Sequence, residues 1–200
     1  AYNQTLYELE NEKSSSFIHL VTMQNHMPYD KDVYNENGKF KISGHEDDRT
    51  DADKIETYLT GINKSDQALE KFIEKIDKLD EKTVVVFWGD HWPGIYGKMF
   101  DKKNNDIHRT PLFIYSNFDT GEKNNLKTMS LNYLTPTVLE EVDAKMSPFH
   151  YLLLDVKKSY PALTRDFKYD NSSDEDKQKL ADYELIEYDI LSGAKWSQES

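Results

Sequence analysis

An aspartate and a histidine stand side by side at the end of the apolar run TVVVFWGDH, which covers residues 83–91. A carboxylate and an imidazole both bind divalent cations such as zinc, manganese or magnesium. Gly89 comes before them and lets the chain turn sharply as it leaves a strand. We therefore interpret Asp90 and His91 as two ligands of one metal site. Such a pair also occurs by chance, and in the alternative Asp90 caps a turn while His91 is a surface residue.

Two further pairs of residues could take part in the chemistry. Asn25 and His26 follow an apolar segment, and if the strands are parallel they open onto the same edge as His91, so that two histidines converge at two strand ends. In the alternative, Asn25 satisfies local backbone groups in a turn and His26 is solvated. His108 and Arg109 precede the segment TPLFIYS. A titratable imidazole beside a fixed guanidinium suits an anionic group such as phosphate, whereas a loop cation pair is the plain alternative.

The elements that would position these residues follow from the spacing of the apolar side chains. Short β-branched or apolar runs predict strands over residues 17–22, 83–88 and 110–116. The run at 83–88 does not alternate, which is typical of a parallel strand covered on both faces. Apolar residues three and four positions apart predict helices over residues 51–79, with a bend near Gly61, and 131–142.

This order of elements predicts an α/β fold in which a sheet has helices on both faces. Sites in such folds lie beyond the carboxyl ends of the strands, where Asp90 and His91 are placed. We expect residues 1–160 to form the main domain. The strongly polar residues 161–200 are expected to be an extension that packs on or beside that domain.

Composition limits the chemistry and the partners. The net charge is -12 and the pI is about 4.9, so the chain repels nucleic acid and anionic lipid surfaces. It contains no cysteine, which leaves oxygen and imidazole groups as metal ligands. No apolar run approaches the roughly 18 residues of a membrane span. Neither a GxSxG elbow nor a phosphate-binding loop is present, and no serine or threonine nucleophile can be singled out.

Five segments, taken in order, resemble the later part of the sulfatase-like catalytic domain of lipoteichoic acid synthases, which belong to the alkaline phosphatase superfamily. They are FIHLVTMQNHMPY, YLTGINKSDQALEKFIEKI, TVVVFWGDHWPG, HRTPLFIYSNF and NYLTPTVLEEV. The resemblance covers about residues 15–160, and the tail is similar to the C-terminal region of phosphoglycerol transferases. It implies a partial alkaline-phosphatase or sulfatase-like fold.

The resemblance also implies roles for the candidate residues. In that family a glutamate, a threonine and the Asp-His pair of a GDH motif hold one divalent cation, often manganese. Asp90 and His91 match that pair, and magnesium or zinc would be alternative ions. His26, with Asn25 beside it, would face the phosphoglycerol unit. His108, with Arg109, would lie near the phosphate.

The family's threonine nucleophile and its first metal ligand lie upstream of the matched segments, and nothing in these 200 residues matches them. We therefore expect no catalytic nucleophile in this chain and an inactive fragment. The parent enzyme would transfer glycerophosphate from phosphatidylglycerol to a glycerophosphate polymer or glycolipid outside the cell, tethered by membrane helices absent here. Two alternatives are a sulfatase or phosphate or phosphonate ester hydrolase of the same superfamily, and a non-catalytic extracellular interaction module.

Overall fold

A computed structural model describes residues 1–30, 33–34, 39–43, 49–96, 105–121, 126–164 and 172–198. The chain forms two units. The first contains Ala1–Thr110 and Tyr115–Phe118, and the second contains Pro111–Ile114 and Asp119–Ser200. A domain boundary at residue 160 stays a prediction. In the part of the chain that the structure describes, no helix combines the length and apolar character needed to cross a lipid bilayer.

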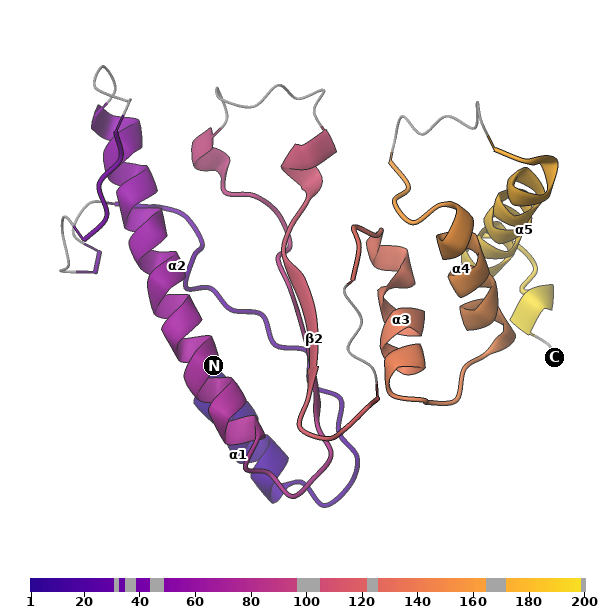
Figure 1. Cartoon of the computed structure of the whole chain (residues 1–200), viewed down its shortest axis with the longest axis horizontal. Helices are drawn as coiled ribbons and strands as arrows, with labels where there is room; N and C mark the ends of the chain where they lie inside the picture. The colour runs from indigo at the N-terminus through magenta and orange to yellow at the C-terminus, as the bar shows by residue number, and fades with distance from the viewer. Residues whose placement is uncertain are drawn as a thin grey trace. The chain divides into compact units, whose positions relative to one another are not determined.

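Helices dominate both units (Figure 1). The elements up to the second strand are α1 (Tyr2–Asn11), α2 (Arg49–Ile76), β1 (Val84–Trp88), η1 (Gly94–Tyr96), η2 (Asn105–His108) and β2 (Leu112–Ser116), where η denotes a 3₁₀ helix. They are followed by η3 (Leu131–Tyr133), α3 (Leu134–Glu141), α4 (Pro148–Ser159), α5 (Asp174–Leu191) and η4 (Trp196–Gln198). The helices predicted over residues 51–79 and 131–142 are confirmed, whereas α1 and α4 were not predicted.

The strands β1 and β2 are neighbours in a two-stranded sheet. The carbonyl oxygen of Thr83 accepts a hydrogen bond from the backbone nitrogen of Asn117 at 3.2 Å. At the other end, the Thr110 hydroxyl donates to the carbonyl oxygen of Gly89 at 2.7 Å. Residue numbers therefore rise on one strand as they fall on the other, so the pair is antiparallel. The predicted parallel arrangement is wrong, because an unbroken apolar run does not fix strand direction.

The strand predicted over residues 17–22 is also wrong for this structure. These residues have no strand assignment, and the side chain of Phe17 is 95% exposed. A strand needs a neighbouring backbone to pair its N–H and C=O groups. Among the described residues, the sheet contains β1 and β2 alone. The apolar sequence was recognised correctly, but a pairing partner cannot be read from it.

The core of the first unit lies where α1 and α2 meet the strands. Leu6, Phe72 and Ile76 are buried there, and Val85 packs against them. The Tyr2 ring stacks on the Phe72 ring with centroids 4.7 Å apart. Burial of this apolar face fixes α2 beside β1.

Asn117 links the end of β2 to the segment that follows α2. Its side-chain nitrogen Nδ2 donates to the carbonyl oxygens of Ile76, Leu79 and Glu81 at 3.1, 3.1 and 3.0 Å. Its Oδ1 accepts from the backbone nitrogen of Thr83 at 2.8 Å. One amide group thus satisfies four backbone groups around the turn that enters β1.

The second unit has its own core, formed by α4, α5 and the segment around η3. Its buried residues are Tyr133, Leu153, Val156, Tyr160, Leu180 and Tyr183. The helix α4 begins with a capping box, in which the Ser147 hydroxyl accepts from the His150 backbone and the His150 ring accepts from the Ser147 backbone. His150, for which the sequence indicated no role, therefore helps to start this helix.

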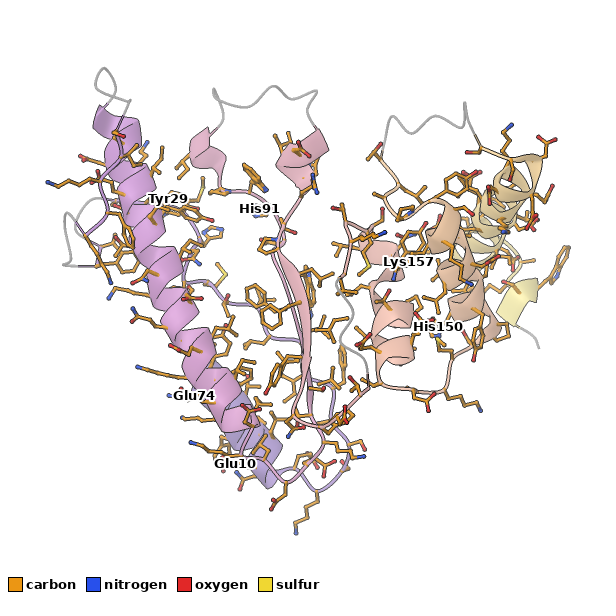
Figure 2. All side chains as sticks on the ribbon, viewed as in Figure 1. Glu10, Tyr29, Glu74, His91, His150 and Lys157 are labelled. Carbon is orange, nitrogen blue, oxygen red and sulfur yellow. The ribbon has the colours of Figure 1, made fainter. Side chains whose placement is uncertain are left out.

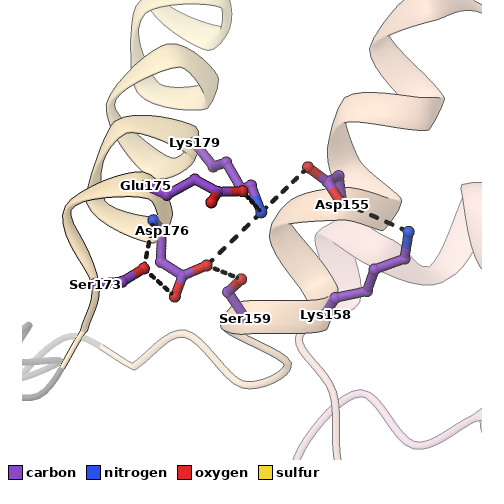
Figure 3. Close-up of polar contacts among 7 residues, drawn as sticks. All are labelled: Asp155, Lys158, Ser159, Ser173, Glu175, Asp176 and Lys179. Atoms are coloured by element: carbon purple, nitrogen blue, oxygen red, sulfur yellow. Dashed lines mark hydrogen bonds and ion pairs between the residues drawn. The ribbon is translucent and has the colours of Figure 1, made fainter.

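A polar cluster joins α4 to α5 (Figure 3). Ser173 is the N-cap of α5, and its hydroxyl accepts from the backbone nitrogen of Asp176 and donates to the Asp176 carboxylate. The Ser159 hydroxyl of α4 donates to the same carboxylate. Lys179 lies 3.0 Å from Glu175 and 3.7 Å from Asp155 of α4. These contacts hold the first turns of α5 against α4.

Candidate functional site

Asp90 and His91 emerge directly beyond the carboxyl end of β1, as predicted. Figure 2 shows His91 at this end of the strand. The two side chains are exposed, 81% for Asp90 and 72% for His91, and Oδ2 of Asp90 lies 3.5 Å from Nε2 of His91. The other carboxylate oxygen, Oδ1, accepts from the backbone nitrogen of His91 at 2.8 Å. The carboxylate is thereby fixed next to the imidazole.

The contacts of the His91 ring define which nitrogen is available. Its Nδ1 lies 2.8 Å from the carbonyl oxygen of Trp92. Because a carbonyl oxygen can only accept a hydrogen bond, Nδ1 carries the proton, and in the neutral ring Nε2 presents a lone pair. Histidine ligands of metals typically donate their second N–H to such an acceptor.

The Asp90 and His91 side chains have the chemistry of divalent-cation ligands. In neutral His91, a nitrogen lone pair and a carboxylate oxygen face each other, and two such acceptors attract each other only through a shared proton or cation. A separation of 3.5 Å allows one ion to contact both, because ligands lie about 2.0–2.2 Å from zinc. Asp90 and His91 therefore fit a divalent cation as two of its ligands. Over the described ranges, no cluster of three or more His, Asp or Glu side chains could hold a metal ion.

The segment containing His108 and Arg109 is tied to the same strand end. The Trp92 indole nitrogen donates to the carbonyl oxygen of Arg109, and the Thr110 hydroxyl donates to that of Gly89. These two bonds bracket the Asp90–His91 pair and fix the backbone that enters β2. The sequence assigned no role in the site to Trp92 or to Thr110.

The Arg109 side chain has a partner of its own. Its guanidinium nitrogen NH1 lies 2.9 Å from a carboxylate oxygen of Asp106, and both side chains are more than half exposed. This ion pair with Asp106 was not predicted from the sequence. Phosphate binding by His108 and Arg109 stays a prediction.

Asn25 and His26 lie in a turn that packs on α2. The backbone nitrogen of His26 donates to the Met23 carbonyl oxygen at 3.2 Å, which closes the turn. The ring nitrogen Nδ1 of His26 lies 2.7 Å from the carbonyl oxygen of Met27. His26 is exposed, and as in His91 this contact places the proton on Nδ1 and leaves Nε2 for a ligand.

The turn that contains His26 also approaches the segment after the Asp90–His91 pair. The Met27 side chain ends 3.8 Å from the position that a Cβ atom would take at Gly94, in η1. Gly94 follows His91 by three residues. All six candidate residues belong to the first unit. A direct approach of His26 to the Asp90–His91 pair stays a prediction.

Comparisons with known proteins were made for the whole chain. Residues 1–144 match the family described as Sulfatase. The structure superposes on Streptococcus pyogenes phosphoglycerol transferase GacH, solved in complex with sn-glycerol-1-phosphate, with a TM-score of 0.81 and 28% sequence identity. The match covers 99% of this chain and 50% of GacH. The α/β, sulfatase-like fold class predicted from the sequence is thus confirmed.

Two curated proteins are similar in sequence. Lipoteichoic acid synthase 1 of Bacillus subtilis (strain 168) is 27% identical over a 126-residue alignment, which covers 56% of this chain and 19% of that protein. A Rhizobium meliloti (strain 1021) protein named "Putative cyclic beta-1,2-glucan modification protein" is 27% identical over a 210-residue alignment, which covers 92% of this chain and 32% of that protein. The chain thus spans a third or less of these relatives. The predicted resemblance to lipoteichoic acid synthases and phosphoglycerol transferases is confirmed.

Proposed function

The chain belongs to the sulfatase family, and we propose that it contributes a metal-binding and substrate-binding half-site to an enzyme that transfers phosphoglycerol groups. The convergence of Asp90 Oδ2 and His91 Nε2 at the end of β1 is the observation on which the proposal rests. GacH, named as a phosphoglycerol transferase, and a lipoteichoic acid synthase are both similar to this chain. These similarities support a phosphate ester as the substrate rather than a sulfate ester.

Asp90 and His91 would hold a divalent cation, with manganese as our first choice and magnesium or zinc as alternatives. When bound, such an ion supplies Lewis-acid stabilisation of charge on the phosphate oxygens. The protein's part is to hold both ligands in place. The backbone nitrogen of His91 fixes one oxygen of Asp90, and the Trp92 carbonyl oxygen fixes the His91 ring.

His26 would bind the phosphoglycerol unit, with Asn25 beside it. The contact of Nδ1 with the Met27 carbonyl oxygen leaves Nε2 as the ring atom able to meet a ligand oxygen. Arg109, together with His108, would bind the phosphate. A phosphate there would compete with Asp106 for the Arg109 guanidinium, because guanidinium groups in general can bind both carboxylates and phosphates.

The nucleophile and the remaining metal ligands are proposed to lie in a part of the protein outside these 200 residues. The chain matches 50% of the GacH chain, which leaves room for them. The 200-residue segment without that part would be inactive. The proposed donor is phosphatidylglycerol and the proposed acceptor a glycerophosphate polymer or glycolipid, at the extracellular face of the cell membrane.

The proposal is tested by measuring glycerophosphate transfer from phosphatidylglycerol by the full-length protein in the presence of manganese. We expect transfer in the native protein and a loss of at least about a hundredfold in Asp90→Ala, because the ion loses a charged ligand. Asp66→Ala, which removes an exposed carboxylate from α2, is the matched control and should retain full activity. Unchanged turnover in Asp90→Ala, or hydrolysis of sulfate esters in preference to phosphate esters, would overturn the proposal.

A further inference from the structure

The turn at residues 24–29 is fastened to one face of α2. Tyr58, Gly61 and Ser65 are spaced by three and four residues, so they lie on the same side of that helix. The Tyr29 ring meets the Tyr58 ring edge-on, with centroids 5.4 Å apart. Figure 2 shows Tyr29 lying against α2. An aromatic contact therefore anchors the end of the turn.

Asn25 directs its side-chain amide into this interface. Its Nδ2 donates to the Ser65 hydroxyl oxygen at 3.0 Å. Its Oδ1 is buried, has no hydrogen-bond partner among the described residues, and lies against Gly61. Its main-chain carbonyl oxygen accepts from the Tyr29 hydroxyl at 2.9 Å. The residue before His26 is thus held through both its side chain and its main chain.

Gly61 packs closely against the turn. A Cβ atom at this position would lie 2.7 Å from Asn25 Oδ1 and 2.8 Å from the hydroxyl oxygen of Tyr34. Real Cβ atoms essentially never come within 3.0 Å of such atoms, so a side chain at residue 61 would shift the ends of the Asn25 and Tyr34 side chains. Glycine costs a helix interior about 1 kcal/mol relative to alanine. The close packing of Asn25 gives a physical reason for glycine in this buried position.

We propose that Asn25, Gly61 and Ser65 are positioning residues for His26, which makes α2 part of the phosphoglycerol subsite. This inference rests on the proposed function of His26. It also gives Asn25 and His26 different roles, because both polar atoms of the Asn25 side chain face α2. Asn25 therefore acts through His26, and the imidazole is the group that meets the ligand.

The His26 ring is positioned by contacts within its own turn. The His26 backbone nitrogen bonds to Met23 and its ring to Met27, so the ring orientation depends on the path of the turn. That path is set at Asn25 by Gly61 and Ser65. A displacement of about 1 Å at a binding group is enough to cost a large part of its contribution.

Gly61→Ala is the direct test, made in the full-length protein. We expect the KM for the phosphoglycerol donor to rise about tenfold, the loss typical of one hydrogen bond to a charged group, with a smaller change in kcat. The ¹⁵N resonances of the His26 ring should move away from the pattern of a single protonated Nδ1. The thermal stability should not fall in proportion to the rise in KM, because alanine has a higher helix propensity than glycine.

Two further variants at Ser65 separate positioning from a general packing defect. Ser65→Ala removes the hydroxyl that holds Asn25 and should reproduce the effect of Gly61→Ala on KM. Ser65→Thr retains a hydroxyl and should restore most of the lost affinity. Lys71→Ala, at an exposed position of α2, is the control and should change neither KM nor the His26 resonances.

The failure of this inference can be told apart from the failure of the proposed function. If His26→Ala itself leaves the KM unchanged, His26 does not bind the donor, and the function proposed for it is wrong. If His26→Ala raises the KM while Gly61→Ala and Ser65→Ala leave both the KM and the His26 resonances as in the native protein, the positioning role is overturned.

Discussion

Nε2 of His91 lies 3.5 Å from Oδ2 of Asp90, while the opposite ring nitrogen of His91 is engaged by the carbonyl oxygen of Trp92. This relationship gives the pair a defined chemistry. In neutral His91, the unprotonated nitrogen and the carboxylate converge on the same space, where a cation would satisfy both. The hydrogen bonds from Trp92 and Thr110 support this arrangement, because they fix the strand end from which the pair emerges.

Loss of the Thr110 hydroxyl is expected to loosen this strand end. Thr110→Val removes the 2.7 Å hydrogen bond to Gly89 while keeping a similar side-chain shape. The free energy of unfolding should fall by about 1–2 kcal/mol, the cost of an unmatched carbonyl group. Urea denaturation measures the change, with Thr135→Val at an exposed helix position as the control. An equal effect of the two substitutions would show that the hydroxyl contributes nothing particular.

Asn117→Ala should be more damaging, because one side chain serves four backbone groups. It removes three donor contacts to carbonyl oxygens and leaves the Thr83 nitrogen without its acceptor. We expect a loss of about 2–4 kcal/mol in the free energy of unfolding.

Two comparisons sharpen the Asn117 prediction. Asn117→Asp keeps the acceptor for Thr83 but places a carboxylate against three carbonyl oxygens, so it should also destabilise the protein. Asn3→Ala, at an exposed position of α1, should change stability by less than about 0.5 kcal/mol. Equal stability of Asn117→Ala and the native protein in urea denaturation would contradict the proposed link.

The lowered pKa of the Asp176 carboxylate predicts that the stability of the fold depends on pH in the acid range. Hydrogen bonds from Ser159 and Ser173, with the charge of Lys179, hold the pKa of Asp176 below its ordinary value of 3.8. A carboxylate with a lowered pKa in the folded state stabilises that state above its unfolded pKa, and the contribution disappears as the pH falls through the folded value. The attachment of α5 to α4 should therefore weaken below about pH 4.

Asp176→Asn tests this pH dependence. The variant should be less stable than the native protein at pH 7, and the difference should shrink as the pH is lowered toward 2. Denaturation midpoints measured across this range provide the comparison. Asp174→Asn removes a fully exposed carboxylate from the same helical turn and controls for the interaction with the helix dipole. A difference from native protein that stays constant with pH would contradict the assignment.

The parts of the fold that sequence predicted best are those governed by local periodicity. The helix α2 follows from its apolar spacing, and β1 and β2 follow from short apolar runs with polar boundaries. The direction of pairing was predicted wrongly because the run VVVFW fits either arrangement. Residues 17–22 were assigned to a strand for their composition, although a strand also requires a pairing backbone that composition does not reveal.

For the candidate site, local pattern predicted the place of Asp90 and His91 at a strand end but not the contacts that support them, and their binding of a metal stays a prediction. Asp90 and His91 were identified because their residue types suit a metal and their place at a strand end exposes them. Gly61 was noticed as a possible bend in a helix, whereas its contact with Asn25 became visible when the turn and α2 were seen together. The supporting roles of Thr110 and Trp92 depend on contacts with residues 21 and 17 positions away, which no local pattern indicates.

The most direct test of the account is calorimetric titration of the full-length protein with manganese. The account predicts saturable binding to the native protein, and affinity at least about tenfold weaker in Asp90→Ala and in His91→Ala, because each removes one ligand. Asp66→Ala should bind as the native protein does. Binding of manganese with native affinity by the double variant Asp90→Ala, His91→Ala would contradict the assignment of these two residues as metal ligands.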